Sequence, residues 1–260
     1  MTRGRLFARL ALVNGRTRLV EHHQNAPLKI ARCFETDGGG LEVCVMDASP
    51  GLLAGDCNEF EWIVETGARV RVTTQGATRI HPSNGPVSAQ NLRLRVAAGA
   101  RLELWPQTTI PFRAARFETK ISGHLEAGAQ LLLLDLLSAG RIARGENLAF
   151  ERLESRIQLF GAHGPLLCIQ NRFVPAEFRL QNPLGWGDAT QLGSLFSFGD
   201  ADEKHACALA RQCLEDGISG GVSGAVSSLA RGGIAVAMGG RRAHDLQRVA
   251  EEIARAWRGV

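Results

Sequence analysis

Hydrophobic and polar positions alternate along much of this chain, and one alternating pattern occurs three times. A Gly-Ala pair is followed by large apolar residues at every second position, beginning at Gly67, Gly99 and Gly128. The positions between them hold Arg, Gln or Glu in five of six cases. A period of two is that of a β-strand with one buried face. Each glycine therefore marks a predicted turn that leads into a half-buried strand.

The three copies are separated by 32 and 29 residues. A fixed spacing of this size is typical of strand-turn units that stack on one another and bury their apolar faces together. We therefore predict a mainly β fold, with solenoid-like stacked β-strand repeats. The 260 residues and 45% hydrophobic content suffice for one large core, and we expect a single domain over residues 1–260.

The last third of the chain changes character and predicts about two α-helices. Asp200 or Asp202 is expected to cap the first helix, and Gly217 is expected to end it. An apolar strand follows at 234–238, and an amphipathic helix is predicted from Ala243 to Trp257. Its apolar face is expected to pack on the β body.

Composition excludes several classes of protein. The apolar run at 131–134 is interrupted by Asp135, and no other run approaches the roughly twenty residues of a membrane span. The apolar stretch 10–13 is too short for an export signal. Six cysteines without a CxxC pair are typical of a reduced, cytoplasmic protein. The net charge of +4 comes from dispersed arginines and Tyr is absent, so we expect neither nucleic-acid nor membrane binding.

One segment of the sequence matches a catalytic motif. Residues 217–221 fit G-x-S-x-G, and His244 and Asp245 follow, so a serine hydrolase using Ser219 is the alternative from another class. The nucleophile elbow needs a strand before the serine and a helix after it, whereas here a helix precedes and strand-like residues follow. The chain lacks a phosphate-binding loop, a dinucleotide fingerprint and a paired-histidine metal motif. We therefore expect no catalysis by this chain.

Five segments in order carry a resemblance to a known family. They are 25–30 (NAPLKI), 49–56 (SPGLLAGD), 73–80 (TTQGATRI), 102–107 (LELWPQ) and 140–146 (GRIARGE). Together they resemble the UreD (UreH) family of urease accessory proteins over most of the chain. PGLLAGD stands where many members have PGGLVGGD, and His81 stands where members often have Tyr. Near Arg172 the chain has neutral amides in place of an acid, so no acidic metal contact is carried over there.

The resemblance implies a non-enzymatic scaffold. It implies binding to apo-urease and cooperation with the F accessory protein and, through it, with the G accessory protein, which would supply GTP hydrolysis. It also implies delivery of Ni²⁺ through an internal passage into the urease active site, with lysine carbamylation of urease in the same assembly. No tightly bound cofactor is implied, because Ni²⁺ is only in transit.

A transient cation path requires sparse oxygen ligands, because a dense Cys/His site would retain the ion. We predict Asp56, Glu146 and Glu103 as metal contacts of this path. Each has a structural alternative. Asp56 ends a Gly-rich turn and fits an Asx turn, Glu146 follows two arginines that it can pair with, and Glu103 lies opposite Arg71 of the preceding repeat.

Two aromatic positions beside strands, Trp105 and Phe112, are candidate anchors for a partner, but we expect such residues to belong to the core more often than to an interface. A β-solenoid interaction module unrelated to nickel remains a further alternative. Failure to bind any urease component would distinguish it.

Overall fold

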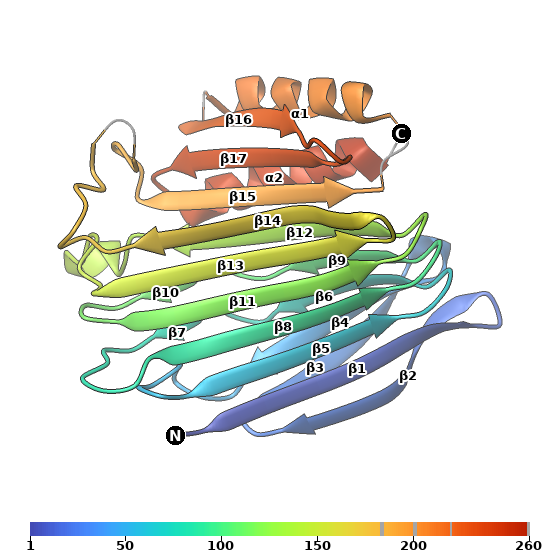
Figure 1. Ribbon diagram of the computed structural model, residues 1–260, viewed down its shortest axis with the longest axis horizontal. Helices are drawn as coiled ribbons and strands as arrows, with labels where there is room; N and C mark the ends of the chain where they lie inside the picture. Colours follow the sequence, from blue (N-terminus) through green and yellow to red (C-terminus); the bar gives the residue numbers. More distant parts are fainter. Residues whose placement is uncertain (183–184, 200–201, 219, 259–260) are drawn as a thin grey trace.

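Two β-sheets face each other, and two helices lie on the outer side of one of them (Figure 1). The computed structural model describes residues 1–182, 185–199, 202–218 and 220–258. The predicted mainly β, solenoid-like fold with helices in the C-terminal third is confirmed.

The seven-stranded sheet forms one wall. Its order is β14 (Gly164–Phe173), β13 (Arg152–Gly161), β11 (Arg116–Leu125), β8 (Ser88–Val96), β5 (Cys57–Val64), β1 (Arg3–Val13) and β2 (Arg16–Asn25). Strands β1, β5, β8, β11 and β13 pair in parallel, and the two outer strands pair antiparallel to their neighbours.

The ten-stranded sheet forms the other wall. Its main path is β16 (Val222–Ser228), β17 (Ile234–Gly240), β15 (Gln191–Phe198), β12 (Gln130–Ser138), β9 (Arg101–Trp105), β6 (Arg69–Thr74), β4 (Gly40–Asp47) and β3 (Leu28–Thr36). The short strands β7 (Thr78–Ile80) and β10 (Thr109–Pro111) pair beside this path. They form a narrow third side of the solenoid, and two 3₁₀ turns, η1 (Asp37–Gly39) and η2 (Ile142–Arg144), complete the elements.

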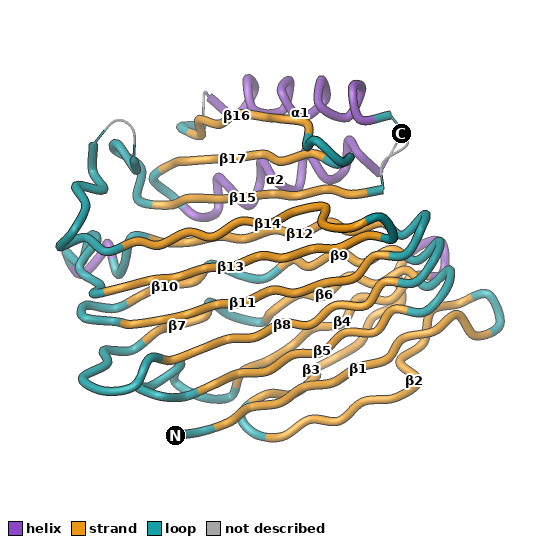
Figure 2. The backbone as a smooth tube through the Cα atoms, viewed as in Figure 1, coloured by secondary structure: helices purple, strands orange, loops and turns teal. Residues whose placement is uncertain are grey.

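The Gly-Ala pairs carry the chain from the seven-stranded sheet into the ten-stranded sheet, and their turns lie above one another at one end of the strands (Figure 2). The glycines at 67, 99 and 128 have φ values of 71°, 67° and 74°. The amide of Arg101 donates to the carbonyl of Ala68 at 2.9 Å, and the amide of Gln130 donates to the carbonyl of Ala100 at 2.8 Å. Because each turn bonds to the next, the repeat predicted from the sequence is one coil of the solenoid.

These turns need glycine because the backbone has a positive φ, and not because a side chain would clash. No atom lies within 4 Å of a Cβ built on Gly99, so Gly99→Ala tests the left-handed backbone conformation alone. We expect a loss of about 1 kcal/mol in the free energy of unfolding. Gly85 is equally open but is not left-handed, so Gly85→Ala is the matched control and should be neutral or slightly stabilising. Urea unfolding of both variants measures the difference, and equal effects would contradict the prediction.

The core lies between the two sheets. The alternate apolar positions after each Gly-Ala turn are buried as predicted; Leu102 is 0% and Leu131 is 1% exposed. Leu132 and Glu103 point to the opposite face and are also buried. The C-terminal helices and the arginines around Glu103 cover this outer face of the ten-stranded sheet.

Both predicted helices are present as α1 (Glu203–Ile218) and α2 (Ala243–Arg258). Asp202 accepts a hydrogen bond from the amide of His205 at 3.0 Å and so caps α1, while Asp200 lies outside the described residues. The prediction that Gly217 ends α1 is off by one residue, because α1 runs to Ile218. Gly217 is buried against α2, and a Cβ atom at this position would lie 2.9 Å from Val249. The glycine therefore lets the two helices approach closely.

The described part of the chain includes no helix that is both long enough and apolar enough to cross a membrane.

Candidate functional site

A cavity of about 320 Å³ lies between the two sheets. Trp62 of β5, Ile121 of β11 and Leu133 of β12 contribute to its apolar lining. Several residues that border it at the ends of β4, β6, β7 and β9 are solvent-exposed, namely Asp47, Pro50, Gln75, Gly76, Arg79 and Gln107. We call this region the mouth, because it is where the cavity reaches the surface.

Asp135 borders the cavity from β12. Its side chain faces the space between the sheets, as those of Leu131 and Leu133 do, because alternate residues of a strand face the same side. Its carboxylate has neither a hydrogen-bond nor an ion-pair partner among the described residues, and burial raises the pKa of Asp135. A buried carboxylate without a partner is costly and is stabilised in its charged form by a cation. Asp135 is therefore the side chain in this cavity best suited to meet a metal ion.

Our sequence reasoning missed Asp135 as a functional residue and noted it only as the interruption of an apolar run. The signal that was missed is the alternation of the strand. Asp135 lies on the same face of β12 as Leu131 and Leu133, which are buried between the sheets. A carboxylate at a core-facing position of an otherwise leucine-rich strand indicates a function.

A smaller cavity of about 190 Å³ adjoins the first. Asp56 and Thr2 line it, and Asp47, Ser49, Gly51 and Asn58 border both cavities. The amide of Asn58 donates to Asp47 at 3.0 Å, which fixes the side chains of this shared wall. Asp47 and Asp56 thus border the smaller cavity, and Asp47 and Asp135 border the larger one.

Asp56 has a structural role, but it does not form the predicted Asx turn, because its side chain accepts from an earlier residue of the Gly-rich turn and from the start of the chain. One carboxylate oxygen accepts from the backbone amide of Thr2 at 2.6 Å, and the other accepts from the amide of Leu53 at 3.0 Å. The same side chain borders the smaller cavity. Its role as a metal contact stays a prediction.

Glu146 pairs with Arg141, as its structural alternative anticipated. The guanidinium donates Nε to Oε2 at 2.8 Å and a second nitrogen to Oε1 at 2.5 Å, and the amide of Arg113 donates to Oε2 at 3.1 Å. Arg141 also lies over the ring of Phe112, 4.0 Å from its centre. The hydrogen bond from Arg141 lowers the pKa of Glu146. Glu146 does not border either cavity.

The Arg141–Glu146 pair predicts a pH dependence of stability. A carboxyl whose pKa is lowered by folding stabilises the folded state above its ordinary value of 4.5 and loses that contribution as the pH falls through the lowered pKa. Glu146→Gln should therefore be less stable than the parent chain at pH 7, by about 1 to 3 kcal/mol, and the gap should narrow below about pH 4.5. Urea unfolding from pH 7 down to pH 4 measures this, and a gap that widens at low pH would exclude the pair as its cause.

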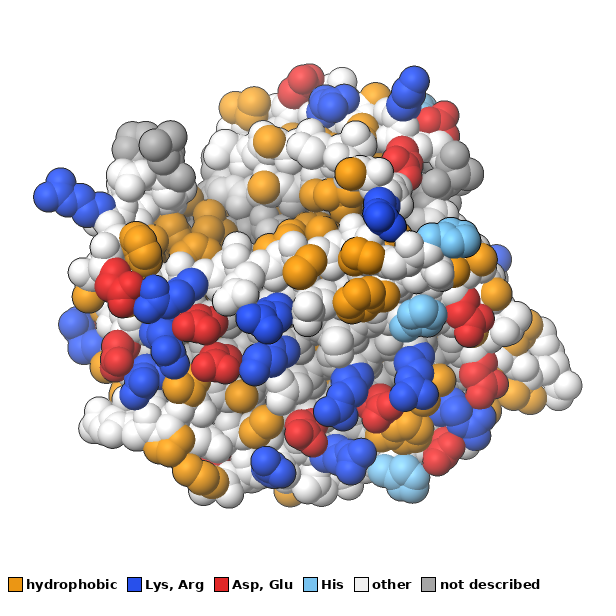
Figure 3. Space-filling view, in the orientation of Figure 1, with side chains coloured by type: hydrophobic (Ala, Val, Ile, Leu, Met, Phe, Trp, Pro, Cys, Tyr) orange, Lys and Arg blue, Asp and Glu red, His pale blue; other side chains and the backbone are white. Residues whose placement is uncertain are grey.

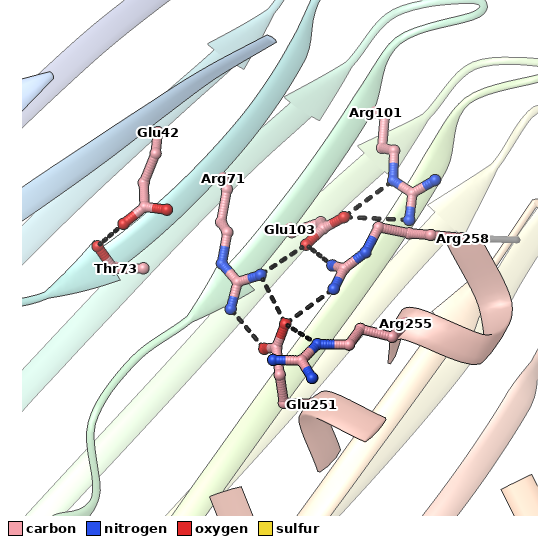
Figure 4. A network of polar contacts seen from close by, with 8 residues as sticks. All are labelled: Glu42, Arg71, Thr73, Arg101, Glu103, Glu251, Arg255 and Arg258. Carbon is pink, nitrogen blue, oxygen red and sulfur yellow. Dashed lines mark hydrogen bonds and ion pairs between the residues drawn. The ribbon is translucent and has the colours of Figure 1, made fainter. Parts of the chain in front are cut away.

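Glu103 lies in an ion network on the outer face of the ten-stranded sheet (Figure 4). The predicted pair with Arg71 of the neighbouring coil is present at 3.5 Å. Arg101 and Arg258 approach the same carboxylate at 3.0 and 2.9 Å. Glu251 of α2 joins the network through Arg71 at 2.6 Å and Arg258 at 2.8 Å. The network fastens α2 to the sheet.

The structure does not bring the three sequence-predicted metal contacts together. They lie on different elements, and each has its own partners. Among residues 1–182, 185–199, 202–218 and 220–258, no group of three or more His, Cys, Asp or Glu side chains is arranged to hold a metal ion. Among these residues, a conducted cation would therefore meet at most two such side chains at a time.

The two aromatic candidates differ. Trp105 is buried in the cluster beneath the helices, which confirms a core position, whereas Phe112 is half-buried at the third side.

The hydrolase alternative lacks its required context. Ser219 lies outside the described residues, but the elements around it are α1 before and β16 after, and β16 is an antiparallel strand. His244 contacts Asp245 at 3.1 Å at the start of α2, where Arg242 also binds Asp245. This order of elements is the reverse of the strand-turn-helix of a nucleophile elbow.

Comparison with known proteins adds a family match. The model of the family described as UreD urease accessory protein matches residues 2–260. Urease accessory protein UreD of Deinococcus radiodurans is 35% identical over 187 residues, which cover 71% of this chain and 67% of the relative. That of Acetivibrio thermocellus is 33% identical over 171 residues, 65% of each chain. Urease accessory protein UreH of Helicobacter pylori is 26% identical over 242 residues, 93% of this chain and 89% of the relative.

Proposed function

Since this chain belongs to the UreD urease accessory protein family, and therefore has a role in urease maturation, we propose that it binds apo-urease and conducts Ni²⁺ toward the urease active site. In this proposal the F accessory protein binds the chain and the G accessory protein, recruited through F, supplies GTP hydrolysis. The assembly forms in the cytoplasm.

The observation that carries the proposal is Asp135, an unpartnered carboxylate in the cavity between the sheets. Carboxylates and carbonyl oxygens hold a divalent cation more weakly than a site built of several imidazoles or thiolates, so the ion can move on. The proposed route enters the smaller cavity at Asp56, passes the shared wall at Asp47, reaches Asp135 and leaves the larger cavity through its mouth. Ni²⁺ is cargo on this route, and the chain needs no tightly bound cofactor.

Glu103 and Glu146 enter the proposal differently. Neither borders the two cavities, and arginine side chains already neutralise both. We retain their metal contact as a prediction for mutagenesis, and we assign the route to Asp56, Asp47 and Asp135.

The relatives are named accessory proteins, which suggests a non-catalytic role. We propose accordingly that this chain catalyses no reaction. A fluorophosphonate probe tests the point: labelling that Ser219→Ala abolishes would establish a serine hydrolase and overturn this part of the proposal.

The deciding experiment is reconstitution. Tagged chain is co-expressed with the F accessory protein and apo-urease of its host, the mixture is separated by size-exclusion chromatography, and nickel-dependent urease activity is assayed. Co-elution with activation is the expected result. A folded chain that binds neither protein would overturn the proposed function and favour an interaction module unrelated to nickel.

A further inference from the structure

The third side of the solenoid exposes a distinctive group of side chains between the two sheets. We define the third-side surface by Arg79, His81, Phe112, Arg113, Ile142 and Arg144. Arg79 belongs to β7 and pairs in register with Ile110 of β10. The remaining residues follow these short strands or lie in η2. Neighbouring strands are about 4.8 Å apart, so consecutive coils place these side chains on one face.

Three side chains, His81, Phe112 and Arg141, pack as a column in the middle of this surface. His81 and Phe112 meet edge to face with ring centres 4.8 Å apart, and Arg141 covers Phe112 at 4.0 Å. A ring nitrogen of His81 also lies within hydrogen-bond distance of the carbonyl of Pro50, at 3.1 Å, and Arg141 forms an ion pair with Glu146. Side chains fixed in this way lose little conformational entropy when a partner binds. The column is thus a preorganised anchor.

Three exposed arginines lie around these side chains. Arg79, Arg113 and Arg144 form no salt bridge among the described residues, although the charge of Arg113 also acts on Glu146. Neighbouring arginines at the same ends of the strands, such as Arg116 and Arg172, do have carboxylate partners. Figure 3 shows Lys and Arg gathered with some acids over these left-hand strand ends. Arginine is enriched at protein interfaces, and a positive patch attracts a negative one.

The same surface borders the mouth of the cavity. Arg79 lines the cavity together with Asp47 and Pro50. At the mouth Arg79 lies beside Asp47, and the two further arginines of the third-side surface lie outside the cavity lining. A docked acidic surface would pair with these arginines while it covers the mouth. An ion that leaves the cavity into water would be lost, so the exit needs a seal made by the protein that accepts the ion.

We infer that the third-side surface docks an acidic face of the protein that receives the ion. The inference rests on the proposed function above, in which that protein is apo-urease. The exposed arginines of the third-side surface supply the electrostatic attraction, and the His81, Phe112 and Arg141 side chains supply the rigid contact.

Charge reversal tests the inference. The variant Arg79→Glu/Arg113→Glu/Arg144→Glu is compared with Arg93→Glu/Arg95→Glu/Arg156→Glu, which reverses three exposed arginines on the outer face of the seven-stranded sheet. We expect the first variant to associate with apo-urease roughly 10- to 100-fold more slowly at low salt, and the second to associate like the parent. Both should co-elute with the F accessory protein, and binding of the parent should weaken as salt increases.

The possible outcomes distinguish failure of the proposed function from failure of the docking inference. A parent chain that binds neither protein overturns the proposed function itself. A third-side variant that binds apo-urease as fast as the parent overturns the inference alone, as does a folded variant that loses the F protein while keeping apo-urease. If the triple variant does not fold, Arg144→Glu alone, in the exposed turn η2, is assayed in the same way and must still slow association with apo-urease.

Discussion

Asp135→Asn is expected to abolish nickel-dependent urease activation while it stabilises the chain. The carboxylate of Asp135 borders the cavity without a partner among the described residues, and burial raises its pKa. Removing its charge removes the one carboxylate on the proposed route at that depth. Asp135 is half-buried beside the cavity, and the same change removes the cost of holding its charge there, so we expect the free energy of unfolding at pH 7 to rise by about 1 kcal/mol.

The pH dependence has a defined sign. Between the ordinary pKa of an aspartate, 3.8, and the raised pKa of Asp135, the folded chain keeps a proton that the unfolded chain has lost. The stability of the parent therefore falls as the pH rises through this window, and Asp135→Asn should not show that fall. Thermal melting across the window and urease activation in the reconstituted complex give the two readouts.

Two controls accompany this variant. Asp188→Asn removes an aspartate whose side chain is 94% exposed and should change neither readout. Asp135→Glu keeps the carboxylate and should retain part of the activation. Full activation by Asp135→Asn would remove Asp135 from the route.

Glu103→Ala is expected to destabilise the chain by about 1 to 3 kcal/mol, because Arg101 loses its carboxylate partner while Arg71 and Arg258 keep only Glu251 among the described residues. The side chain of Glu103 is 8% exposed, and Arg71, Arg101 and Arg258 all approach it. The loss should be seen as a lower urea midpoint and as release of α2 from the sheet.

Glu35→Ala is the matched control, because Glu35 pairs with Arg16 and Arg18 while 48% exposed. An exposed pair of this kind is worth about 1 kcal/mol or less. The Glu103 variant also decides between the two roles considered for that residue. If Glu103→Gln remains folded and fully supports activation, Glu103 is structural; if it remains folded and activation is lost, the predicted metal contact is supported.

Local patterns predicted much of the fold. The Gly-Ala repeats predicted the turns, the buried faces of their strands and even the Arg71–Glu103 pair, because stacked coils in register place equivalent positions side by side. The covering of Glu103 by α2 was not predictable, since Arg258 lies 155 residues further along the chain. Strands β7 and β10, with three residues each, are too short to show a period.

The candidate site was predicted less well, because a cavity is a property of two sheets and not of one segment. Asp56 was found through its Gly-rich turn and does border the smaller cavity. Asp135 was missed, since an apolar run with one acid also describes a strand that faces solvent at that point. The position of Asp135 at the cavity follows only from the pairing of β12 between β9 and β15, which turns this side chain inward.

The stacking of coils also fixes a length. Strands β4 and β12, which bear Asp47 and Asp135, are separated by three strand spacings, or roughly 14 Å at about 4.8 Å for each spacing. Inserting or deleting one coil of about thirty residues would change this separation by one spacing and leave the other turns intact. The distance that an ion travels between these two carboxylates would thus vary among relatives in discrete steps, set by the number of coils.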